Sequence, residues 1–340
     1  MTDERTKSEK TLGWAILGTG SIAHQFAGGL RESQYGKLVS VGSRKLESAE
    51  KFCQEFGGTP CDSYQAAIDF PGVQAVYIGL PHHMHSEWTI KAAQAQKAIL
   101  CEKPFTLTHA EAERTLQEVK REGVAFMDAF MFRYHPQTAK VCELIKSGRI
   151  GEPQIIDAEF GFNASRDWDG FRSVNSLGGG ALMDVGCYCV ELSLLIFQGE
   201  PTRCEYAAQI GPKGYDETGV GLLTFPEGRS THFATAVHLT LKNEATIHGT
   251  KGHIRIQDPW KVRQGAKILV YKSGDLEPNE IIDLSDSNDF LYGCEADEMA
   301  DLVQSSELKR LACNRVLTSM KTLDRLRESA GLHFEGEENR

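Results

Sequence analysis

The sequence has no excess of positive charge, no CxxC cysteine pair and no uninterrupted apolar run of the length that spans a bilayer. Its 340 residues carry 37 Lys and Arg against 47 Asp and Glu, a formal charge of −10. A binder of duplex nucleic acid normally presents a basic face, so this balance argues against a nucleic-acid partner. A membrane-spanning helix needs about 20 mostly apolar residues, so we also expect no membrane partner.

Cysteine is present but in a pattern that favours neither disulfides nor metal. The nine cysteines are scattered, and Cys187 and Cys189 are separated by a single residue, a poor spacing for zinc or for an intrachain bridge. The first ten residues are charged and lack the apolar core of a secretory signal. We therefore expect a cytoplasmic protein with reduced thiols and no metal site.

The first third of the chain alternates short apolar runs with amphipathic helical patterns. Short buried strands between amphipathic helices are typical of a parallel sheet covered on both faces. We therefore predict an α/β protein whose residues 11–135 form a Rossmann dinucleotide-binding domain. Its strands are expected at 14–17, 38–41, 75–79, 98–101 and 124–127.

The pattern changes after Pro136, where period-two alternation becomes frequent. Phe233, Val237, Leu239 and Leu241 fall on one side of such an alternation. Alternation of this kind favours a large, mainly antiparallel open sheet. We predict a second α/β domain over residues 136–340, with helices at 181–197 and near the end of the chain, and further strands at 202–209, 220–225 and 268–271.

A glycine-rich turn follows the first predicted strand and opens the first predicted helix. It runs Gly18-Thr19-Gly20-Ser21-Ile22-Ala23. Gly18 permits the tight turn, Gly20 lets backbone N–H groups approach a pyrophosphate, and Ala23 allows close packing of the helix on the strand. The positive end of the helix then faces the phosphates. Its place between a strand and a helix favours a dinucleotide site over an incidental glycine turn.

The second predicted strand is followed by Ser43, Arg44 and Lys45, 25 residues after Gly18. A site that prefers NAD places Asp or Glu here, where it accepts hydrogen bonds from the ribose. A hydroxyl with two cations suits the additional 2′-phosphate of NADP instead. The alternative is that the two cations are solvated charges at a helix start. The sequence predicts NADP as the cofactor, with NAD less favoured.

Two further segments carry groups suited to proton transfer. Glu102-Lys103-Pro104 follows a predicted strand, at the edge where open parallel sheets bind ligands. Asp184 and Tyr188 follow three glycines and stand four residues apart, on one face of a predicted helix. Those glycines permit close approach by a ligand or by another chain segment. Taken singly, each segment is also compatible with a surface lysine or a core tyrosine.

Together these motifs resemble the Gfo/Idh/MocA oxidoreductase family. The matching stretches are GTGSIA, SRK, the run from Pro81-His82-His83-Met84-His85 to Glu102-Lys103-Pro104, and GGGALMDVGCY. Many members carry histidine at the position of Tyr188. In having tyrosine there, the chain resembles the branch of dimeric dihydrodiol dehydrogenase, NADP-dependent D-xylose dehydrogenase and glucose–fructose oxidoreductase. That branch often has Glu and Trp at the positions of Asp128 and Phe132.

The resemblance implies specific roles for the residues that match. Tyr188 would exchange a proton with a substrate hydroxyl, Lys103 would assist it as a nearby cation, and Asp184 would orient the substrate or the lysine. The Phe171-Arg172 pair resembles an aromatic–arginine pair that reaches the cofactor in related reductases. The alternative is that Arg172 is a surface arginine. Trp168 and Trp260 line a sugar-stacking wall or pack in the core. The implied cofactor contacts outside the glycine turn are Ser43, Arg44, Lys45, Pro81, His85, Glu102, Lys103 and Arg172.

The resemblance also implies an activity and an assembly. The expected reaction is NADP-dependent hydride transfer to or from a secondary or anomeric alcohol of a sugar, polyol or cyclic diol, such as D-xylose or a trans-dihydrodiol. A homodimer or homotetramer is expected through the C-terminal sheet. Two alternatives remain open: a non-enzymatic NADP-binding sugar sensor, and glycoside cleavage by transient oxidation with a tightly held dinucleotide.

Overall fold

The computed structural model describes residues 10–165, 170–263, 265–284 and 291–335, with side chains 306–311 not described. Contacts divide the described chain into two units. One contains residues 10–134 together with 291–317, and the other contains residues 135–284 and 318–335. The expected division placed all of residues 136–340 in the second domain. The structure differs, because residues 291–317 belong to the first unit.

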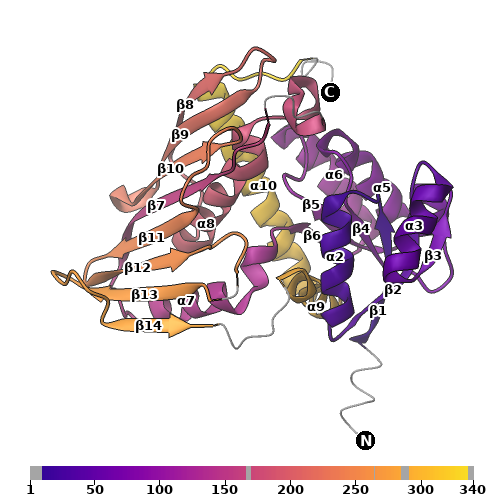
Figure 1. Ribbon diagram of the computed structural model, residues 1–340, viewed down its shortest axis with the longest axis horizontal. Helices are drawn as coiled ribbons and strands as arrows, with labels where there is room; N and C mark the ends of the chain where they lie inside the picture. Colours follow the sequence, from indigo (N-terminus) through magenta and orange to yellow (C-terminus); the bar gives the residue numbers. More distant parts are fainter. Residues whose placement is uncertain (1–9, 166–169, 264, 285–290, 336–340) are drawn as a thin grey trace, which may run out of the picture. The chain divides into compact units, whose positions relative to one another are not determined.

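The first unit is a six-stranded parallel sheet with helices between its strands (Figure 1). Its strand order β3-β2-β1-β4-β5-β6 is that of a doubly wound dinucleotide-binding fold, which confirms the predicted Rossmann architecture. Strands β1, β4, β5 and β6 are buried along their full length, as the apolar runs require. The strands are β1 (Leu12–Leu17), β2 (Gly36–Gly42), β3 (Thr59–Cys61), β4 (Ala75–Ile78), β5 (Ala98–Glu102) and β6 (Phe126–Ala129). The helices are α2 (Ser21–Glu32), α3 (Leu46–Phe56), α4 (Tyr64–Ile68), α5 (His85–Gln94) and α6 (His109–Glu122).

A helix from late in the chain completes this first unit. Helix α9 (Leu291–Gln304) packs along α2, where a Cβ atom on Gly29 would lie 2.6 Å from the Cβ atom of Tyr292. The Tyr292 hydroxyl donates to Gln25 Oε1 at 2.7 Å. Glycine at position 29 thus allows the two helices to touch, and the sequence pattern alone did not reveal this helix.

The second unit is an eight-stranded sheet with the order β14-β13-β12-β11-β7-β10-β9-β8. Neighbouring strands are antiparallel except for the central pair, β7 and β10, so the prediction of a large, mainly antiparallel sheet is confirmed. The strands are β7 (Pro153–Gly161), β8 (Arg203–Ile210), β9 (Asp216–Thr224), β10 (Ser230–Ala236), β11 (Glu244–Gly249), β12 (Gly252–Gln257), β13 (Lys267–Lys272) and β14 (Glu280–Asp283).

Helices cover one face of this sheet (Figure 1). In helix α7 (Pro136–Lys146), the Gln137 side chain donates a hydrogen bond to the carbonyl oxygen of Gln257 in β12. Helix α8 (Cys187–Phe197) packs on β7. In helix α10 (Ser306–Ser329), the Ser329 hydroxyl accepts a hydrogen bond from the Tyr206 N–H group of β8. The opposite face carries exposed apolar side chains, including Val220 and Leu222.

Two local expectations differ from the structure. Strand β10 ends at Ala236, so the alternation from Val237 to Leu241 lies outside a strand, and Leu239 is 52% exposed. The segment Asn175–Phe197 is long and apolar enough to span a bilayer, contrary to our reading of the apolar runs. Because 89% of its apolar window is buried and it carries Asp184 and Glu191, we interpret it as a core segment.

Candidate functional site

The glycine turn joins β1 to α2 as predicted. Gly18 has a φ of 100°, and a Cβ atom there would lie 2.9 Å from the carbonyl oxygen of Gly79, so the turn requires glycine. Gly20 is the N-cap of α2, no side chain caps that end, and no acidic residue occupies its first turn. A Cβ atom on Gly20 would meet nothing within 4 Å. The amino end of α2 is therefore uncapped and bordered by open space, which suits a pyrophosphate.

The end of β2 presents the residues expected at the adenosine ribose. Ser43 is 7% exposed, whereas Arg44 and Lys45 are exposed. The Lys45 N–H group donates to Ser43 Oγ at 3.4 Å, and Arg44 is hydrogen-bonded to the Tyr64 hydroxyl. Arg44 is thus held at the carboxyl end of the sheet rather than being fully solvated.

His85 joins two loops at the same edge of the first sheet. Its Nε2 atom lies 2.8 Å from the carbonyl oxygen of Leu80, and its Nδ1 atom lies 3.0 Å from that of Pro104. Burial lowers the pKa of His85 to about 4, although the backbone carbonyls beside the ring act in the opposite direction. A neutral, fully buried ring between two backbone segments fits a positioning role better than proton transfer. Pro81 is the N-cap of the short helical turn His82–Met84, which leads to His85.

Glu102 and Lys103 stand where β5 ends. The Tyr77 hydroxyl donates to Glu102 Oε1 at 2.6 Å, and the Lys103 N–H group donates to Glu102 Oε2 at 3.3 Å. The Lys103–Pro104 peptide bond is cis. Lys103 is 8% exposed, so it is not a solvated surface lysine. The chain therefore presents Lys103 from a buried and hydrogen-bonded strand end.

A buried acid from α9 borders this strand end and was not predicted. Glu295 is fully buried, and its carboxyl oxygens have no hydrogen-bond partner in the described part of the chain. Burial, together with the nearby Glu102 carboxylate, raises the pKa of Glu295 well above its usual value. Burial and the same Glu102 raise the pKa of Tyr292. The surroundings of Glu295 therefore favour the protonated, neutral form of its carboxyl group.

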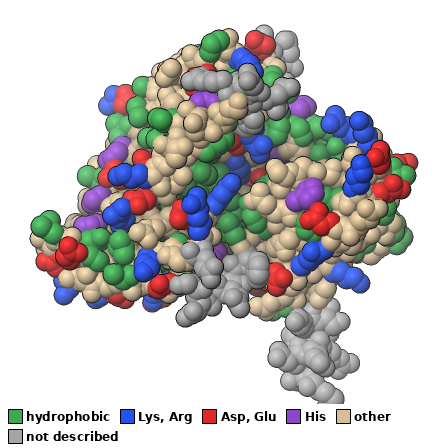
Figure 2. All heavy atoms as spheres, in the orientation of Figure 1, with side chains coloured by type: hydrophobic (Ala, Val, Ile, Leu, Met, Phe, Trp, Pro, Cys, Tyr) green, Lys and Arg blue, Asp and Glu red, His purple; other side chains and the backbone are tan. Residues whose placement is uncertain are grey.

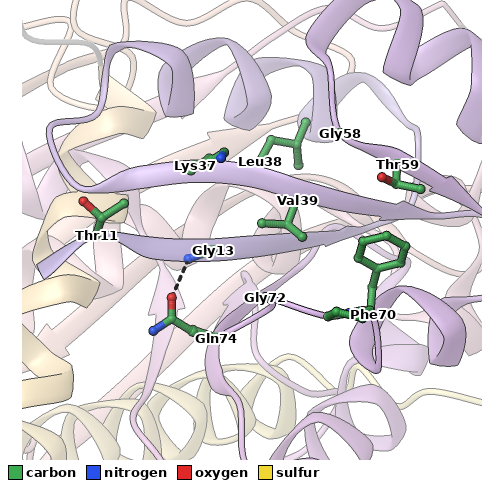
Figure 3. Close-up of a pocket in the computed structure, with 11 residues that line it drawn as sticks. Thr11, Gly13, Lys37, Leu38, Val39, Gly58, Thr59, Phe70, Gly72 and Gln74 are labelled. Atoms are coloured by element: carbon green, nitrogen blue, oxygen red, sulfur yellow. Dashed lines mark hydrogen bonds between the residues drawn. The ribbon is translucent and has the colours of Figure 1, made fainter. Parts of the chain in front are cut away.

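The cavity in Figure 3 lies at the other edge of the first sheet. It has a volume of about 580 Å³ and is lined by residues at the amino ends of the strands, among them Gly13, Lys37 and Thr59. The Gln74 side chain points toward β1 and accepts the Gly13 N–H group at 3.0 Å. Because Gly18 and Lys103 follow the carboxyl ends of their strands, this cavity contains none of the predicted site residues.

In the second unit, two of the three glycines, Gly179 and Gly180, allow another chain segment to approach, which is one of the two options that the sequence left open. A Cβ atom on Gly179 would lie 2.5 Å from the carbonyl oxygen of Arg172. One on Gly180, whose φ is 122°, would lie 2.0 Å from Asp216 Oδ1. The helix after them begins with a π-helical stretch, Leu182–Gly186, before α8. Asp184 lies inside that stretch, a feature that is frequent at functional sites.

Arg172 is paired with Asp184 rather than solvated. Its Nε atom lies 3.0 Å from Asp184 Oδ1, and its guanidinium lies 4.6 Å from the centre of the Phe171 ring. The Asp184 side chain is 7% exposed. The structure thus brings together two residues that the sequence singled out separately.

Tyr188 lies in the first turn of α8, against two aromatic rings. The ring centres of Phe160 and Trp260 are 5.1 and 6.1 Å from that of Tyr188. Trp260 is 1% exposed and donates its indole N–H group to the carbonyl oxygen of Glu159, so it packs in the core. Trp168 lies outside the described residues. The described residues contain no group of ligands suited to a metal ion.

Comparison with known proteins agrees with this architecture. A family model described as "Oxidoreductase family, NAD-binding Rossmann fold" matches residues 12–130, and the Gfo/Idh/MocA C-terminal domain model matches residues 138–255. The chain belongs to the Gfo/Idh/MocA oxidoreductase family. It is an oxidoreductase with an NAD(P)-binding Rossmann domain.

Members of the Gfo/Idh/MocA family with named activities are similar over most of the chain. The mouse trans-1,2-dihydrobenzene-1,2-diol dehydrogenase is 33% identical over 258 residues, 73% of this chain and 75% of that protein. The D-xylose 1-dehydrogenase (NADP(+)) 2 of Haloferax volcanii is 29% identical over 321 residues, 93% of this chain and 97% of that one. The 3-ketoreductase KijD10 of Actinomadura kijaniata, solved with NADP and TDP-benzene, has the same fold, with a TM-score of 0.85 and 24% identity over 94% of this chain and 98% of that one.

Proposed function

We propose that this protein transfers hydride between NADP and a secondary or anomeric alcohol of a sugar, polyol or cyclic diol. Its membership of the Gfo/Idh/MocA family, with relatives named for D-xylose and dihydrodiol oxidation, carries the choice of substrate class. Asp184, which is 7% exposed, is paired with Arg172 and lies four residues before Tyr188, and this arrangement supports the chemistry. A pure sensor would not require a buried proton-transfer set.

In this proposal the residues of the chain handle the proton and NADP, when bound, supplies the hydride acceptor. Tyr188 takes the proton from the substrate hydroxyl during oxidation and returns it to the carbonyl oxygen during reduction. An ordinary tyrosine titrates near pH ~10, so a neighbouring cation is needed to favour the phenolate. Lys103 supplies that cation, and Asp184, held by Arg172, orients the substrate hydroxyl.

The preference for NADP rests on the end of β2. Arg44 and Lys45 are exposed cations there, beside the Ser43 hydroxyl, with no carboxylate at these three positions. Guanidinium and ammonium groups bind a 2′-phosphate by charge-assisted hydrogen bonds. A carboxylate at this place would instead repel the phosphate and favour NAD.

We also propose a homodimer or homotetramer through the open face of the second sheet. Exposed apolar residues occur on that face at Val220, 58% exposed, Leu222, 37%, and Ile281, 55%. Leu222 of β9 lies opposite His232 of β10, which lies opposite Asp157 of β7, so these three residues share one face of the sheet. Figure 2 shows hydrophobic, histidine and charged side chains mixed over this sheet, at the left of the view. The exposed apolar residues among them, Val220, Leu222 and Ile281, are the part of this face that an interface would bury.

Nicotinamide absorbance tests the proposed function directly. Purified protein is mixed with NADP or NAD and a panel of aldopyranoses, inositols and a trans-dihydrodiol, with Tyr188→Phe in parallel. Reduction of NADP by one of these alcohols, lost in the variant, is the expected result. Intact NADP binding with no turnover of any alcohol, or of the matching carbonyl compounds with NADPH, would reject a dehydrogenase and favour the sensor.

A further inference from the structure

The carboxylate of Asp216 lies against the amino end of the segment that carries Asp184 and Tyr188. Asp216 begins β9 and is 2% exposed. Its Oδ2 atom accepts the Leu182 N–H group at 2.7 Å and the Tyr206 hydroxyl at 2.7 Å. The Ala181 N–H group also donates to this carboxylate. As described above, glycine at position 180 leaves room for its other oxygen.

This helix start depends on an acceptor from elsewhere in the fold. The first N–H groups of a helix have no acceptor within it, and leaving them unpaired inside a protein is costly. Neither Ala181 nor Gly186, which precede the π-helical and α-helical stretches, offers a side-chain acceptor. Asp216 supplies one from a strand 34 residues beyond Leu182.

We propose that Asp216 is a positioning residue that fixes the start of this helix, so that Asp184 and Tyr188 are correctly placed for the reaction. The inference rests on the proposed function. Asp184 follows Leu182 by two residues, and its N–H group donates to the Gly180 carbonyl at 3.0 Å. A displacement of the helix start would therefore move the Asp184 carboxylate first and Tyr188 with it. A shift of about 1 Å in a reacting group can cost roughly 100-fold in rate.

The charge of Asp216 fits this role. The groups that face it in the described part of the chain are the Tyr206 hydroxyl of β8, the N–H groups of Ala181 and Leu182 at the helix start, and its own N–H group. Burial raises the pKa of Asp216 to about 6, although these hydrogen bonds favour the charged form. At pH 7 and above the group is mainly ionised, and a negative charge is favourable at the amino end of a helix.

Asp216→Asn tests the inference because it keeps the shape and removes the charge and one acceptor. We expect kcat to fall about 10- to 100-fold, with an unchanged KM for NADP, because the glycine turn belongs to the other unit. We expect amide exchange over residues 181–188 to become at least about tenfold faster. Asp283→Asn, on strand β14 of the same sheet, is the matched control and should leave both measurements unchanged.

The pH profile separates positioning from a purely structural role. Wild-type kcat should fall as the pH is lowered through about 6, where Asp216 takes up its proton, and Asp216→Asn should lose this step. A variant that melts earlier but keeps the wild-type kcat per folded molecule and the wild-type pH profile would overturn the inference. If Asp216→Asn does not fold, Tyr206→Phe takes its place, because it removes one hydrogen-bond partner of the carboxylate. We expect smaller changes of the same kind in kcat, in its pH profile and in amide exchange. A wild-type pH profile of kcat in Tyr206→Phe would overturn the inference.

Failure of the proposed function is distinguishable from failure of this inference. If wild-type protein transfers no hydride with any substrate of the panel, the proposed function is rejected, and amide exchange then decides the role of Asp216. Faster exchange confined to residues 181–188 in Asp216→Asn would support its hold on the helix. Exchange identical to that of wild type would reject it.

Discussion

Arg172 and Asp184 form an ion pair whose Nε and Oδ1 atoms lie 3.0 Å apart, twelve residues apart in the sequence. Asp184 is almost buried, whereas 31% of the Arg172 side chain is exposed. The pair ties the loop that carries Phe171 to the π-helical stretch before Tyr188. We therefore expect this contact to affect the stability of the second unit and, under the proposed function, the activity of the protein.

Removing the guanidinium should affect both properties. Arg172→Met keeps much of the side-chain length but leaves the Asp184 carboxylate without this partner. We expect the second unit to lose about 1 kcal/mol of stability, a modest value because Arg172 is partly exposed to solvent. We expect kcat to fall about tenfold, as Asp184 is less well oriented. Thermal unfolding and steady-state turnover measure these effects, and Arg203→Met, an exposed arginine paired with Glu205, should change neither.

Tyr188→Phe should separate cofactor binding from chemistry. The ring keeps its packing against Phe160 and Trp260, so the fold and NADP affinity should be retained. Without the hydroxyl there is no acid or base, and turnover should fall at least ~100-fold, the scale of general acid–base catalysis. Fluorescence titration and nicotinamide absorbance measure the two quantities. Tyr35→Phe, in the first unit, is the control, and near-normal turnover in Tyr188→Phe would exclude this residue as the proton carrier.

Arg44→Ala should weaken NADP selectively. Loss of a charge-assisted hydrogen bond to the 2′-phosphate is expected to raise the Kd for NADP about 10- to 100-fold, while the Kd for NAD stays the same. Titration calorimetry with both nucleotides measures the ratio. Lys37→Ala, at the amino ends of the strands, should alter neither affinity. Equal weakening of NAD and NADP by Arg44→Ala would contradict the proposed preference.

Glu295→Gln should remove a pH dependence from the stability of the first unit. Because the pKa of Glu295 is raised above its usual 4.5, the folded chain holds a proton that the unfolded chain loses. The contribution of this group is fully present below pH 4.5 and is lost as the pH rises through the folded-state pKa. The wild-type unfolding free energy should thus fall relative to that of Glu295→Gln as the pH rises above 4.5. Urea unfolding of both proteins across this range measures the difference, and parallel curves would argue against a neutral Glu295.

Leu222→Asp should break the proposed assembly. A carboxylate on the open face of the second sheet would be buried without a partner when two copies associate, which is strongly unfavourable. We expect light scattering after gel filtration to give the mass of a single chain, 37.6 kDa, for the variant and a multiple of it for wild type. Leu276→Asp, at a position 95% exposed between β13 and β14, is the control. An unchanged mass in Leu222→Asp would exclude this part of the face from the interface.

The sequence predicts most of the first unit, because buried parallel strands leave continuous apolar runs and the glycine turn is local. Strand β3 and helix α9 were missed for a physical reason. Strand β3 has three residues, and α9 takes its place only by packing on α2. In the second unit β7 was missed, since its role as a central strand depends on parallel pairing with β10, more than 70 residues later.

The candidate site shows the same division between local and long-range information. Gly18, Lys103, Asp184 and Tyr188 stand out by their local motifs. Asp216 does not, because an aspartate before a strand resembles an ordinary turn residue. Its significance comes from Tyr206 and Leu182, which reach it from two other elements of the fold.

The late position of α9 has a consequence for synthesis of the chain. The ribosome releases the six strands of the first unit well before residues 291–304, and at about 5–20 residues per second the delay is roughly 10–30 s. During that time the face of α2 around Gly29 lacks the helix that covers it in the finished protein. A nascent chain must therefore keep this apolar face from binding elsewhere, and the nucleotide-binding unit reaches its final form only after residue 304 has been added to the chain.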